Sequence, residues 1–314
     1  MAEKKATREA YGQALATLGE TYDFLVLDAD LAAATKTGMF KKKFPDRFFD
    51  CGIAEGNMMS VAAGIATTGR TVFASSFAMF AAGRAFEQVR NSIGYPHLNV
   101  KIGATHAGIT VGEDGATHQC NEDIALMRTI PGMTVVCPAD ATEAFAAVEA
   151  AVRIQGPVYL RFGRYPVPDL SAEMKNYTFE PGKGVTYRDG KDVTIVATGY
   201  MVHLAVEAAE ELEKSGISAR VINIHTIKPL DTALLIAAAK ETGAIVTAEE
   251  HSVIGGLGAA VCEAVAGACP VPVLRVGVED KFGQSGTVPE LLEAYGLTAA
   301  HIVSAAKDAV AMKR

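Results

Sequence analysis

The residues best suited to chemistry lie in two stretches of the first half of the chain. Residues 105–119 read Thr-His-Ala-Gly-Ile-Thr-Val-Gly-Glu-Asp-Gly-Ala-Thr-His-Gln, with three glycines, two histidines and two acidic residues. The imidazoles of His106 and His118 can donate or accept hydrogen bonds near neutral pH, and the Asp114 carboxylate suits hydroxyl groups. The carboxyl of Glu55 stands close to the start of a predicted helix. Long loops of this composition usually serve a ligand, so we expect a binding site here.

The elements that must hold these residues are short apolar runs alternating with longer amphipathic segments. This alternation is typical of a parallel sheet covered by helices. In the first half we expect strands at residues 24–27, 71–75, 100–104, 134–137 and 158–161, and helices at residues 7–20, 57–68, 82–93, 122–129 and 141–153. In the second half we expect strands at residues 193–198, 219–224, 244–248 and 273–276, helices at residues 202–214, 232–241 and 254–268, and two further C-terminal helices. Ligands of such sheets bind at the carboxyl ends of the strands, where the candidate residues stand.

The periodic pattern lapses between residues 165 and 184, where prolines, glycines and mixed polar residues follow one another. We therefore expect two three-layer α/β domains, at residues 1–170 and 185–314, joined by a linker at residues 171–184. A chain of 314 residues is long enough to give each domain its own core.

Composition narrows the classes of function. The hydrophobic fraction of 49%, the charged fraction of 21% and the net charge of −7 are those of a soluble enzyme. There is no basic stripe, so we expect neither nucleic acid nor a membrane as partner. The N-terminus lacks an apolar signal segment and the five cysteines show no CxxC spacing. We therefore expect a cytoplasmic protein with reduced thiols.

The sequence resembles the transketolase family over essentially the whole chain. The matching features follow the family's order: Thr7-Arg8, Ala-Asp-Leu at residues 29–31, Gly-Ile-x-Glu at residues 52–55, the pair Phe77 and Phe80, and His-(x)11-His with Gly-Glu-Asp-Gly-x-Thr-His-Gln at residues 106–119. Each match is weak alone, and the combination is highly specific. The resemblance implies a pyrimidine-binding domain followed by a transketolase C-terminal domain. It also implies a thiamine-diphosphate enzyme of pentose phosphate metabolism, which transfers a two-carbon ketol (glycolaldehyde) unit between ketose and aldose phosphates.

The same resemblance assigns the cofactor-binding residues. Glu55 matches the family's glutamate that hydrogen-bonds N1′ of the cofactor's aminopyrimidine, which favours the tautomer whose 4′-nitrogen can accept a proton. Phe77 and Phe80 match the aromatic pocket around that ring, and Asp30 matches a further cofactor contact. An ordinary core position is the alternative for each phenylalanine, and a charge at a helix N-terminus is the alternative for Glu55.

The substrate residues also follow from the resemblance. His106 and His118 match catalytic contacts to the hydroxyl and carbonyl oxygens of the sugar, and Asp114 matches a hydroxyl contact. Arg8 and Arg161 match arginines that hold the sugar phosphate, and Arg164 is near enough in sequence to replace Arg161. The alternative for each histidine is a hydrogen bond that stabilises the loop, and the alternative for each arginine is a surface salt bridge.

Two departures from the family pattern leave the sugar open. Ala107 stands where transketolases have aspartate. The pair Ala107-Gly108 is similar to the related deoxyxylulose-phosphate synthases, but those enzymes have arginine at the position of His106. The serine that helps to hold phosphate is replaced within residues 32–34, where only alanine occurs. One of Thr35, Lys36 and Thr37 is placed to compensate.

The chain contains no Gly-Asp-Gly motif, with which the family holds the diphosphate through a metal ion. We therefore expect no metal site in this chain, and a separate N-terminal subunit that binds Mg2+ or Ca2+ together with the diphosphate. The expected assembly is an α2β2 heterotetramer in which this chain also self-associates, and the chain alone should be inactive. We expect the second domain to serve structure and assembly, without a catalytic residue.

Two other functions fit a similar pattern. The chain could be a β subunit of a 2-oxoacid dehydrogenase or part of a deoxyxylulose-phosphate-synthase-like enzyme, which take 2-oxoacids as donors. It could also be a non-catalytic regulatory or scaffold subunit, although a scaffold has no need of Glu55, His106, Asp114 and His118.

Overall fold

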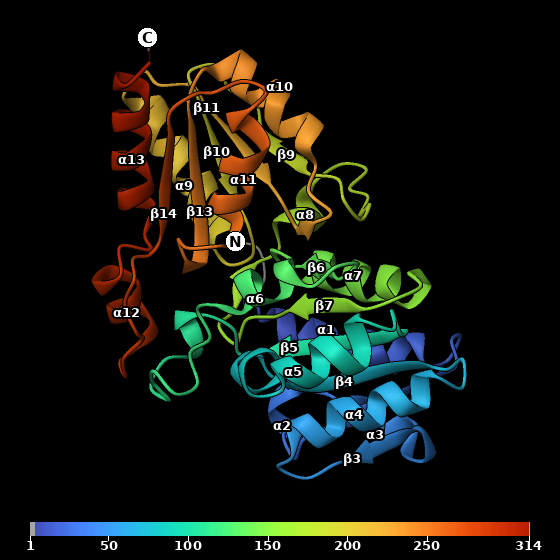
Figure 1. Cartoon of the computed structure of the whole chain (residues 1–314). Coiled ribbons are helices and arrows are strands. Elements are labelled where there is room, and N and C mark those ends of the chain that lie inside the picture. The colour runs from blue at the N-terminus through green and yellow to red at the C-terminus, as the bar shows by residue number, and fades with distance from the viewer. Residues whose placement is uncertain (1–3, 314) are drawn as a thin grey trace.

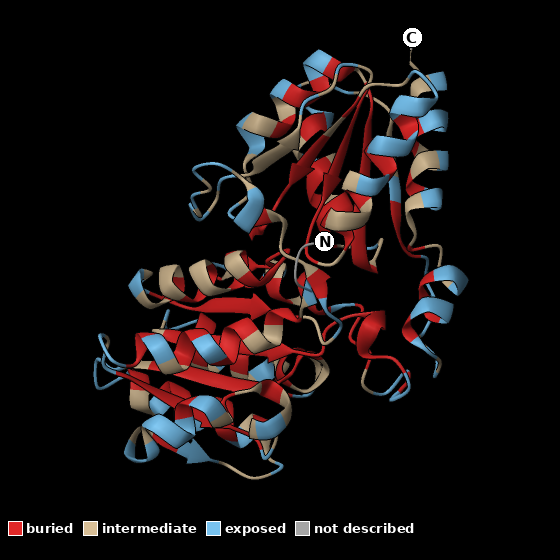
Figure 2. Cartoon of the chain, turned by 180° about the vertical axis from the view of Figure 1, so that it is seen from behind, coloured by how far each residue is buried: buried red, intermediate tan, exposed pale blue. Residues whose placement is uncertain are grey.

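A computed structural model describes residues 4–313 and shows two stacked α/β domains (Figure 1). The first holds most of a seven-stranded sheet and the second a five-stranded sheet, each covered by helices. Figure 2 shows buried strands inside shells of helices that expose one face. The predicted class of two three-layer α/β domains is thus confirmed. Within the described part of the chain, no helix is both long and apolar enough to span a bilayer.

The first sheet has the strand order β12-β6-β7-β5-β4-β2-β3. Its strands are β2 (Phe24–Asp28), β3 (Phe48–Asp50), β4 (Thr71–Phe77), β5 (Val100–Thr105), β6 (Thr134–Val136), β7 (Val158–Arg161) and β12 (Thr226–Lys228). All neighbouring strands are parallel except β12, which comes from the second half of the chain and pairs antiparallel with β6. The long strands β4 and β5 are buried on both faces, which explains why small and apolar residues predominate in them, with Lys101 as the buried charged exception in β5.

Helices cover both faces of this sheet. The helices α1 (Thr7–Leu18) and α7 (Ala141–Arg153) pack on one face. The other face is covered by α4 (Glu55–Ala66), η2 (Met79–Arg84), α5 (Phe86–Gln88), η3 (Val89–Gly94) and α6 (Asp123–Thr129). Short helices α2 (Ala32–Thr35), α3 (Gly38–Lys43), η1 (Pro45–Arg47) and η4 (Ile109–Val111) lie in connections. Helix α7 begins where the sequence predicted, because the Asp140 side chain accepts a hydrogen bond from the backbone N–H of Glu143 at 3.0 Å.

The second sheet has the strand order β14-β13-β10-β11-β9. Its strands are β9 (Val185–Arg188), β10 (Val193–Ala197), β11 (Ala219–Asn223), β13 (Ile245–Ser252) and β14 (Val273–Val278). Its helices are α9 (Met201–Lys214), α10 (Thr232–Thr242), α11 (Leu257–Ala266), α12 (Val288–Ala294) and α13 (Ala299–Ala311). Strand β8 (Val167–Pro168) and helix α8 (Leu170–Glu173) lie between the main units in sequence, and β8 pairs antiparallel with β1 (Lys4–Lys5), which precedes α1.

Several elements differ from the sequence prediction, which missed the edge strands β3 and β9. The helix expected at residues 82–93 begins earlier, at Met79, and consists of two π-helical segments joined by α5. Strand β12 is too short to leave a periodic pattern. Strand β13 continues four residues beyond the predicted end at Ala248, through the buried polar side chains of Glu249, Glu250 and His251. Apolar periodicity misses this extension because these side chains are polar and have partners in both domains.

Candidate active site

The carboxyl ends of four parallel strands meet at one edge of the first sheet. Asp28 at the end of β2 pairs in register with Asp50 at the end of β3, and Phe77 at the end of β4 pairs with Thr105 at the end of β5. The loops that leave these strands carry Glu55, the phenylalanine pair and His106. The topology therefore gathers residues that are far apart in sequence at the edge where such sheets bind ligands.

Glu55 is the first residue of α4, and its side chain is almost fully buried. Its partner is Arg84 at the end of η2, whose Nη1 lies 3.0 Å from both carboxylate oxygens. The Arg84 guanidinium also covers the ring of Phe80, with its central carbon 4.4 Å from the ring centroid. Sequence analysis did not assign a role to Arg84, because only the return of η2 over the start of α4 brings the two residues together.

The Arg84 guanidinium occupies the space between Glu55 and Phe80 and so indicates what kind of group fits there. It is flat, carries N–H donors, and contacts both an acidic group and an aromatic face. An aminopyrimidine ring is likewise flat and carries an N–H donor. The combination of the Glu55 carboxylate and the Phe80 ring therefore fits such a ring.

The aromatic pair extends from Glu55 toward the histidines. The rings of Phe77 and Phe80 are stacked with centroids 5.9 Å apart, and His106 stacks on Phe77 at 3.8 Å. His118 meets Phe80 edge-on at 5.3 Å. One continuous group of rings thus joins the predicted cofactor residues to the predicted substrate residues.

His106 is buried and has a left-handed backbone, with φ of 55°. Its Nε2 lies 2.9 Å from Arg8 Nη1, and its Nδ1 lies 2.9 Å from the Thr105 hydroxyl. Because a guanidinium can only donate, Nε2 accepts, and the ring proton is on Nδ1 and is donated to Thr105. Burial, reinforced by the charge of Arg8, lowers the pKa of His106 to about 3. The ring is therefore neutral at physiological pH.

Positive charges surround this neutral imidazole. Arg8, Arg164 and Lys36 all act on His106, each opposing its protonation. Of the three residues expected to compensate for the missing serine, Thr35 and Thr37 both donate to the buried Asp28 carboxylate at 2.7 Å. Lys36 therefore remains as the available group for an anion.

The two predicted acidic residues Asp30 and Asp114 lie at the exposed outer rim of this group of residues. Asp30 is exposed, with φ of 61°, and its backbone N–H donates to Asp50 Oδ1 at 3.0 Å. The Asp114 carboxylate is half-exposed and lies 3.5 Å from Arg164 Nη1. Neither side chain contacts Glu55 or His106, so their predicted roles need a ligand or a partner surface near the rim.

Arg161 lies apart from the other predicted phosphate ligands. Its side chain is buried, and Nε donates to Asp123 Oδ2 at 2.8 Å. Its Nη2 donates to the backbone carbonyls of Glu250 at 2.9 Å and Cys120 at 3.3 Å. Arg164, the expected substitute, is part of the cationic group around His106 and is partly exposed. The geometry therefore favours Arg164 over Arg161 as a phosphate ligand.

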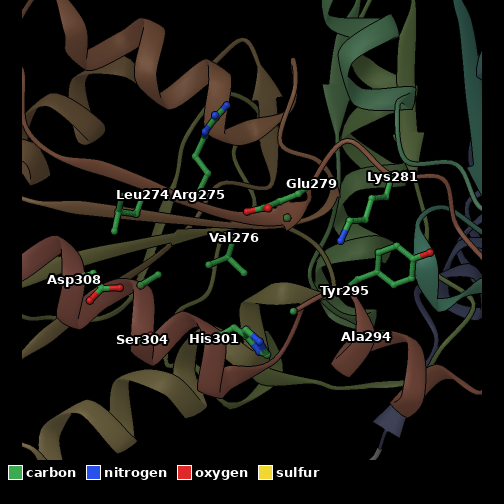
Figure 3. A pocket seen from close by; sticks show the side chains of 13 residues that line it. Leu274, Arg275, Val276, Glu279, Lys281, Ala294, Tyr295, His301, Ser304 and Asp308 are labelled. Atoms are coloured by element: carbon green, nitrogen blue, oxygen red, sulfur yellow. The ribbon is translucent and has the colours of Figure 1, made fainter.

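A cleft of about 690 Å³ opens beside Phe80 and Arg84. It lies between the first domain and the segment after β14, and Thr117, Gln119 and Phe282 contribute to its walls. A second hollow, of about 450 Å³, lies within the second domain between β14 and the helices α12 and α13 (Figure 3). Its lining mixes cationic and acidic side chains and includes none of the predicted site residues: Leu274, Arg275, Val276, Gly277, Glu279, Lys281, Ala294, Tyr295, Gly296, His301, Ser304, Ala305 and Asp308. Phe80 is the predicted site residue that lines the first cleft, so we place the candidate active site where this cleft meets the group of rings around His106.

Comparison with known families matches both halves of the chain. Residues 3–168 match the pyrimidine-binding domain of transketolase, and residues 182–302 match the transketolase C-terminal domain. A putative transketolase C-terminal section from Methanocaldococcus jannaschii is 50% identical and aligns with 93% of this chain and 92% of its own length. A 6-deoxy-6-sulfo-D-fructose transketolase subunit from Clostridium sp. is 45% identical over 99% of this chain and 96% of its own length. Mouse transketolase-like protein 2 is 41% identical over 97% of this chain but only 49% of its own length.

Solved structures give the same result. A split-gene transketolase, described as an inactive beta4 tetramer, superposes with a TM-score of 0.91 at 56% identity, over 98% of this chain and 99% of the other. Transketolase from Leishmania mexicana superposes with a TM-score of 0.82 at 25% identity, over 99% of this chain and 46% of the other. Several relatives are thus chains of this length, and others are about twice as long.

Proposed function

Because the chain belongs to the transketolase family, we propose that it is the pyrimidine-binding subunit of a split, thiamine-diphosphate-dependent transketolase. In this proposal the enzyme transfers a two-carbon ketol unit from a ketose phosphate to an aldose phosphate. A separate subunit holds the diphosphate and its Mg2+ or Ca2+, and the two chains form an α2β2 assembly. The bound cofactor would supply a carbon centre able to stabilise negative charge during transfer.

The observation that carries this proposal is the joining of Glu55 to the histidine loop through an aromatic wall. The Glu55 carboxylate is buried and is joined to the Phe80 ring by Arg84, and the neighbouring rings lead from there to His106 and His118. We assign Glu55 to hold the pyrimidine nitrogen, with Phe80 and Phe77 bounding the ring and Asp30 near the rim. Because Arg84 covers both Glu55 and Phe80, we expect its side chain to move when the cofactor binds.

The sugar side of the site is assigned by its hydrogen-bonding groups and charge. We assign His106 and His118 to the carbonyl and hydroxyl oxygens of the sugar, and Asp114 to a hydroxyl. The neutral imidazole can exchange its Arg8 partner for a sugar hydroxyl, which donates to Nε2, without titrating. Arg8, Arg164 and Lys36 form the phosphate-binding group in this proposal, which favours a phosphorylated sugar.

The identity of the sugar is open because relatives act on different ones. One relative is a subunit acting on 6-deoxy-6-sulfo-D-fructose, and another, from Phocaeicola vulgatus and 40% identical, is a subunit acting on apulose 4-phosphate. These two sugars and the ketose phosphates of the proposal all carry an anionic group. The cationic group around His106 is consistent with any of them, and the departures at Ala107 and residues 32–34 fall within this part of the site.

Reconstitution with the partner tests the proposal. The partner is expected to be a chain of similar size with Gly-Asp-Gly, encoded beside this one. The mixture should transfer a ketol unit from a ketose phosphate and should not consume pyruvate, whereas each chain alone should be inactive. Turnover of sugar phosphates by this chain alone would contradict the split assignment. Pyruvate consumption would favour the 2-oxoacid alternative, and an active complex that tolerates loss of Glu55 would favour the scaffold alternative.

A further inference from the structure

The loop that carries His106 and His118 is anchored in the second domain. The Thr110 backbone N–H donates to Glu250 Oε1 at 2.6 Å. The Ile109 side chain is fully buried in the hydrophobic core of the second domain, together with Val288 and Leu291. At the far end of the loop, the Gln119 side-chain amide donates to the backbone carbonyl of Gln284 at 2.9 Å. The loop therefore lies between the aromatic wall of the first domain and the body of the second.

Glu250 stands at the centre of these contacts. It lies on β13, which runs toward the junction of the two domains (Figure 1), and its side chain is 3% exposed. Gly108 packs directly on its carboxyl group, so closely that a Cβ on Gly108 would overlap the carboxyl atoms. The carboxylate therefore touches the loop on both sides of Ile109, at Gly108 and Thr110, which are two and four residues after His106.

The Glu250 backbone is fixed as well as its side chain. The Arg161 Nη2 donates both to the Glu250 carbonyl and to the Cys120 carbonyl, which directly follows the loop. Arg161 itself is held by the buried Asp123 carboxylate. This buried ion pair ties the end of β7, the end of the loop and β13 into one unit.

The loop needs such support because of its backbone. His106, Gly108, Gly112 and Gly115 all have positive φ values, of 55°, 79°, 86° and 75°. A left-handed conformation is unfavourable for His106 and persists only where the surroundings hold it. A buried carboxylate that accepts a backbone N–H is a strong, directional anchor for such a turn.

We propose that Glu250 is a positioning residue of the transketolase reaction, which holds His106 and His118 in place for the sugar by anchoring the loop between them. This inference rests on the proposed function. It assigns a role in the reaction to the second domain, where sequence analysis expected only structure and assembly. Glu250 acts through the loop and does not itself contact substrate.

The neighbouring Glu249 offers a matched control. It lies on the same strand, is equally buried, and accepts from the backbone N–H groups of Leu257 at 2.7 Å and Gly258 at 2.8 Å. Burial raises the pKa of both carboxyl groups to about 7. Glu249 differs in that its hydrogen-bond partners all belong to the second domain. Removing it should destabilise that domain without loosening the loop.

The experiment compares Glu250→Ala, Glu249→Ala and Glu250→Gln in the full chain, alone and assembled with its partner. Hydrogen exchange at residues 106–119 should become about tenfold to hundredfold faster in Glu250→Ala and stay unchanged in Glu249→Ala, because only the first loses the anchor. In the assembled enzyme, Glu250→Ala should raise KM for the donor sugar about tenfold while the affinity for thiamine diphosphate stays the same. Glu250→Gln keeps an acceptor oxygen, so it should keep most of the wild-type protection and a KM close to the wild-type value.

Several results would overturn the proposal. One is loop exchange that is equally fast in the Glu249 and Glu250 variants, and another is a Glu250→Ala enzyme whose melting temperature alone changes. If Glu250→Ala does not fold, Glu250→Gln decides, with an expected increase of about threefold in loop exchange at residues 109–111. Wild-type complex without ketol transfer would refute the proposed function, while the exchange measurement would still show whether Glu250 holds the loop.

Discussion

The two sides of the candidate site are built differently. On the sugar side, Thr105, His106 and residues 107–111 are fully or almost fully buried, and the loop is fastened to the second domain. On the cofactor side, Arg84 is 54% exposed and Ile53, two residues before Glu55, is 78% exposed. The chain itself thus encloses the histidine loop more completely than the surroundings of Glu55.

The largest effect is expected on the open side, from Glu55→Gln. The amide cannot share a proton with a ring nitrogen as a carboxyl group does, so turnover by the reconstituted enzyme should fall by about 10²- to 10⁴-fold. Steady-state assay of ketol transfer measures this, and circular dichroism checks that the chain still folds. Glu87→Gln is the control, because Glu87 is exposed and its carboxylate accepts hydrogen bonds from its near neighbours Gln88 and Asn91. Near-normal turnover in Glu55→Gln would remove Glu55 from the chemistry.

A pair of arginines sharpens the comparison between buried and exposed groups. Arg161→Met leaves the buried Asp123 carboxylate without its ionic partner, so the free energy of unfolding should fall by about 3 kcal/mol. Arg164→Met removes a partly exposed charge that lies near Asp114 and Glu113 and donates a hydrogen bond to the Val111 backbone carbonyl. Its effect on stability should be about 1 kcal/mol or less, while KM for a phosphorylated donor should rise about tenfold.

Denaturant unfolding and sugar kinetics distinguish the two arginines. If Arg161→Met instead kept full stability and raised KM alone, then Arg161 would bind phosphate as the sequence resemblance implied. Its internal hydrogen bonds to Glu250 and Cys120 would in that case rearrange in the complex.

The sequence was sufficient for the fold class and for the motifs whose residues the structure brings to one edge of the first sheet. Apolar periodicity located the long strands and most helices, and the Asp140 cap located the start of α7. The motifs around Glu55 and His106 could be recognised because each is contiguous in sequence. Parallel pairing then brings the ends of their strands together, so proximity followed from the predicted class.

The supporting contacts could not be predicted in the same way. Arg84 and Glu55 are 29 residues apart in sequence and meet only because η2 returns over the start of α4. Glu250 lies in a polar stretch where strand periodicity ends, and its partner Thr110 belongs to the other domain. A buried carboxylate next to the Gly108 backbone requires long-range packing, which a local pattern does not contain. Arg161 was assigned to phosphate by position alone, since its burial depends on Asp123 and β13.

The smallest effect is expected from the pH dependence of the buried side. Burial together with Arg8 lowers the pKa of His106 to about 3, whereas an unfolded histidine titrates near about 6.5. The unfolded chain therefore binds a proton between these pH values and the folded chain does not, so folding stability falls as pH decreases below about 6.5. Between pH 7 and pH 5 this residue alone should cost about 2 kcal/mol of the free energy of unfolding.

The matched variant is His106→Asn, because asparagine tolerates the left-handed backbone at this position. Other buried groups titrate in the same range, and the pKa values of Glu249 and Glu250 are both raised to about 7. The stability that these two glutamates contribute has the opposite pH dependence, because it is lost as pH rises from about 4.5 toward 7. The effect of His106 is therefore measured as the difference between variant and wild type. Urea unfolding at pH 5, 6 and 7 should show a loss toward low pH that is about 2 kcal/mol smaller in His106→Asn. Equal pH dependence in the two chains would mean that His106 is accessible to protons, and the sugar side would then be as open as the cofactor side.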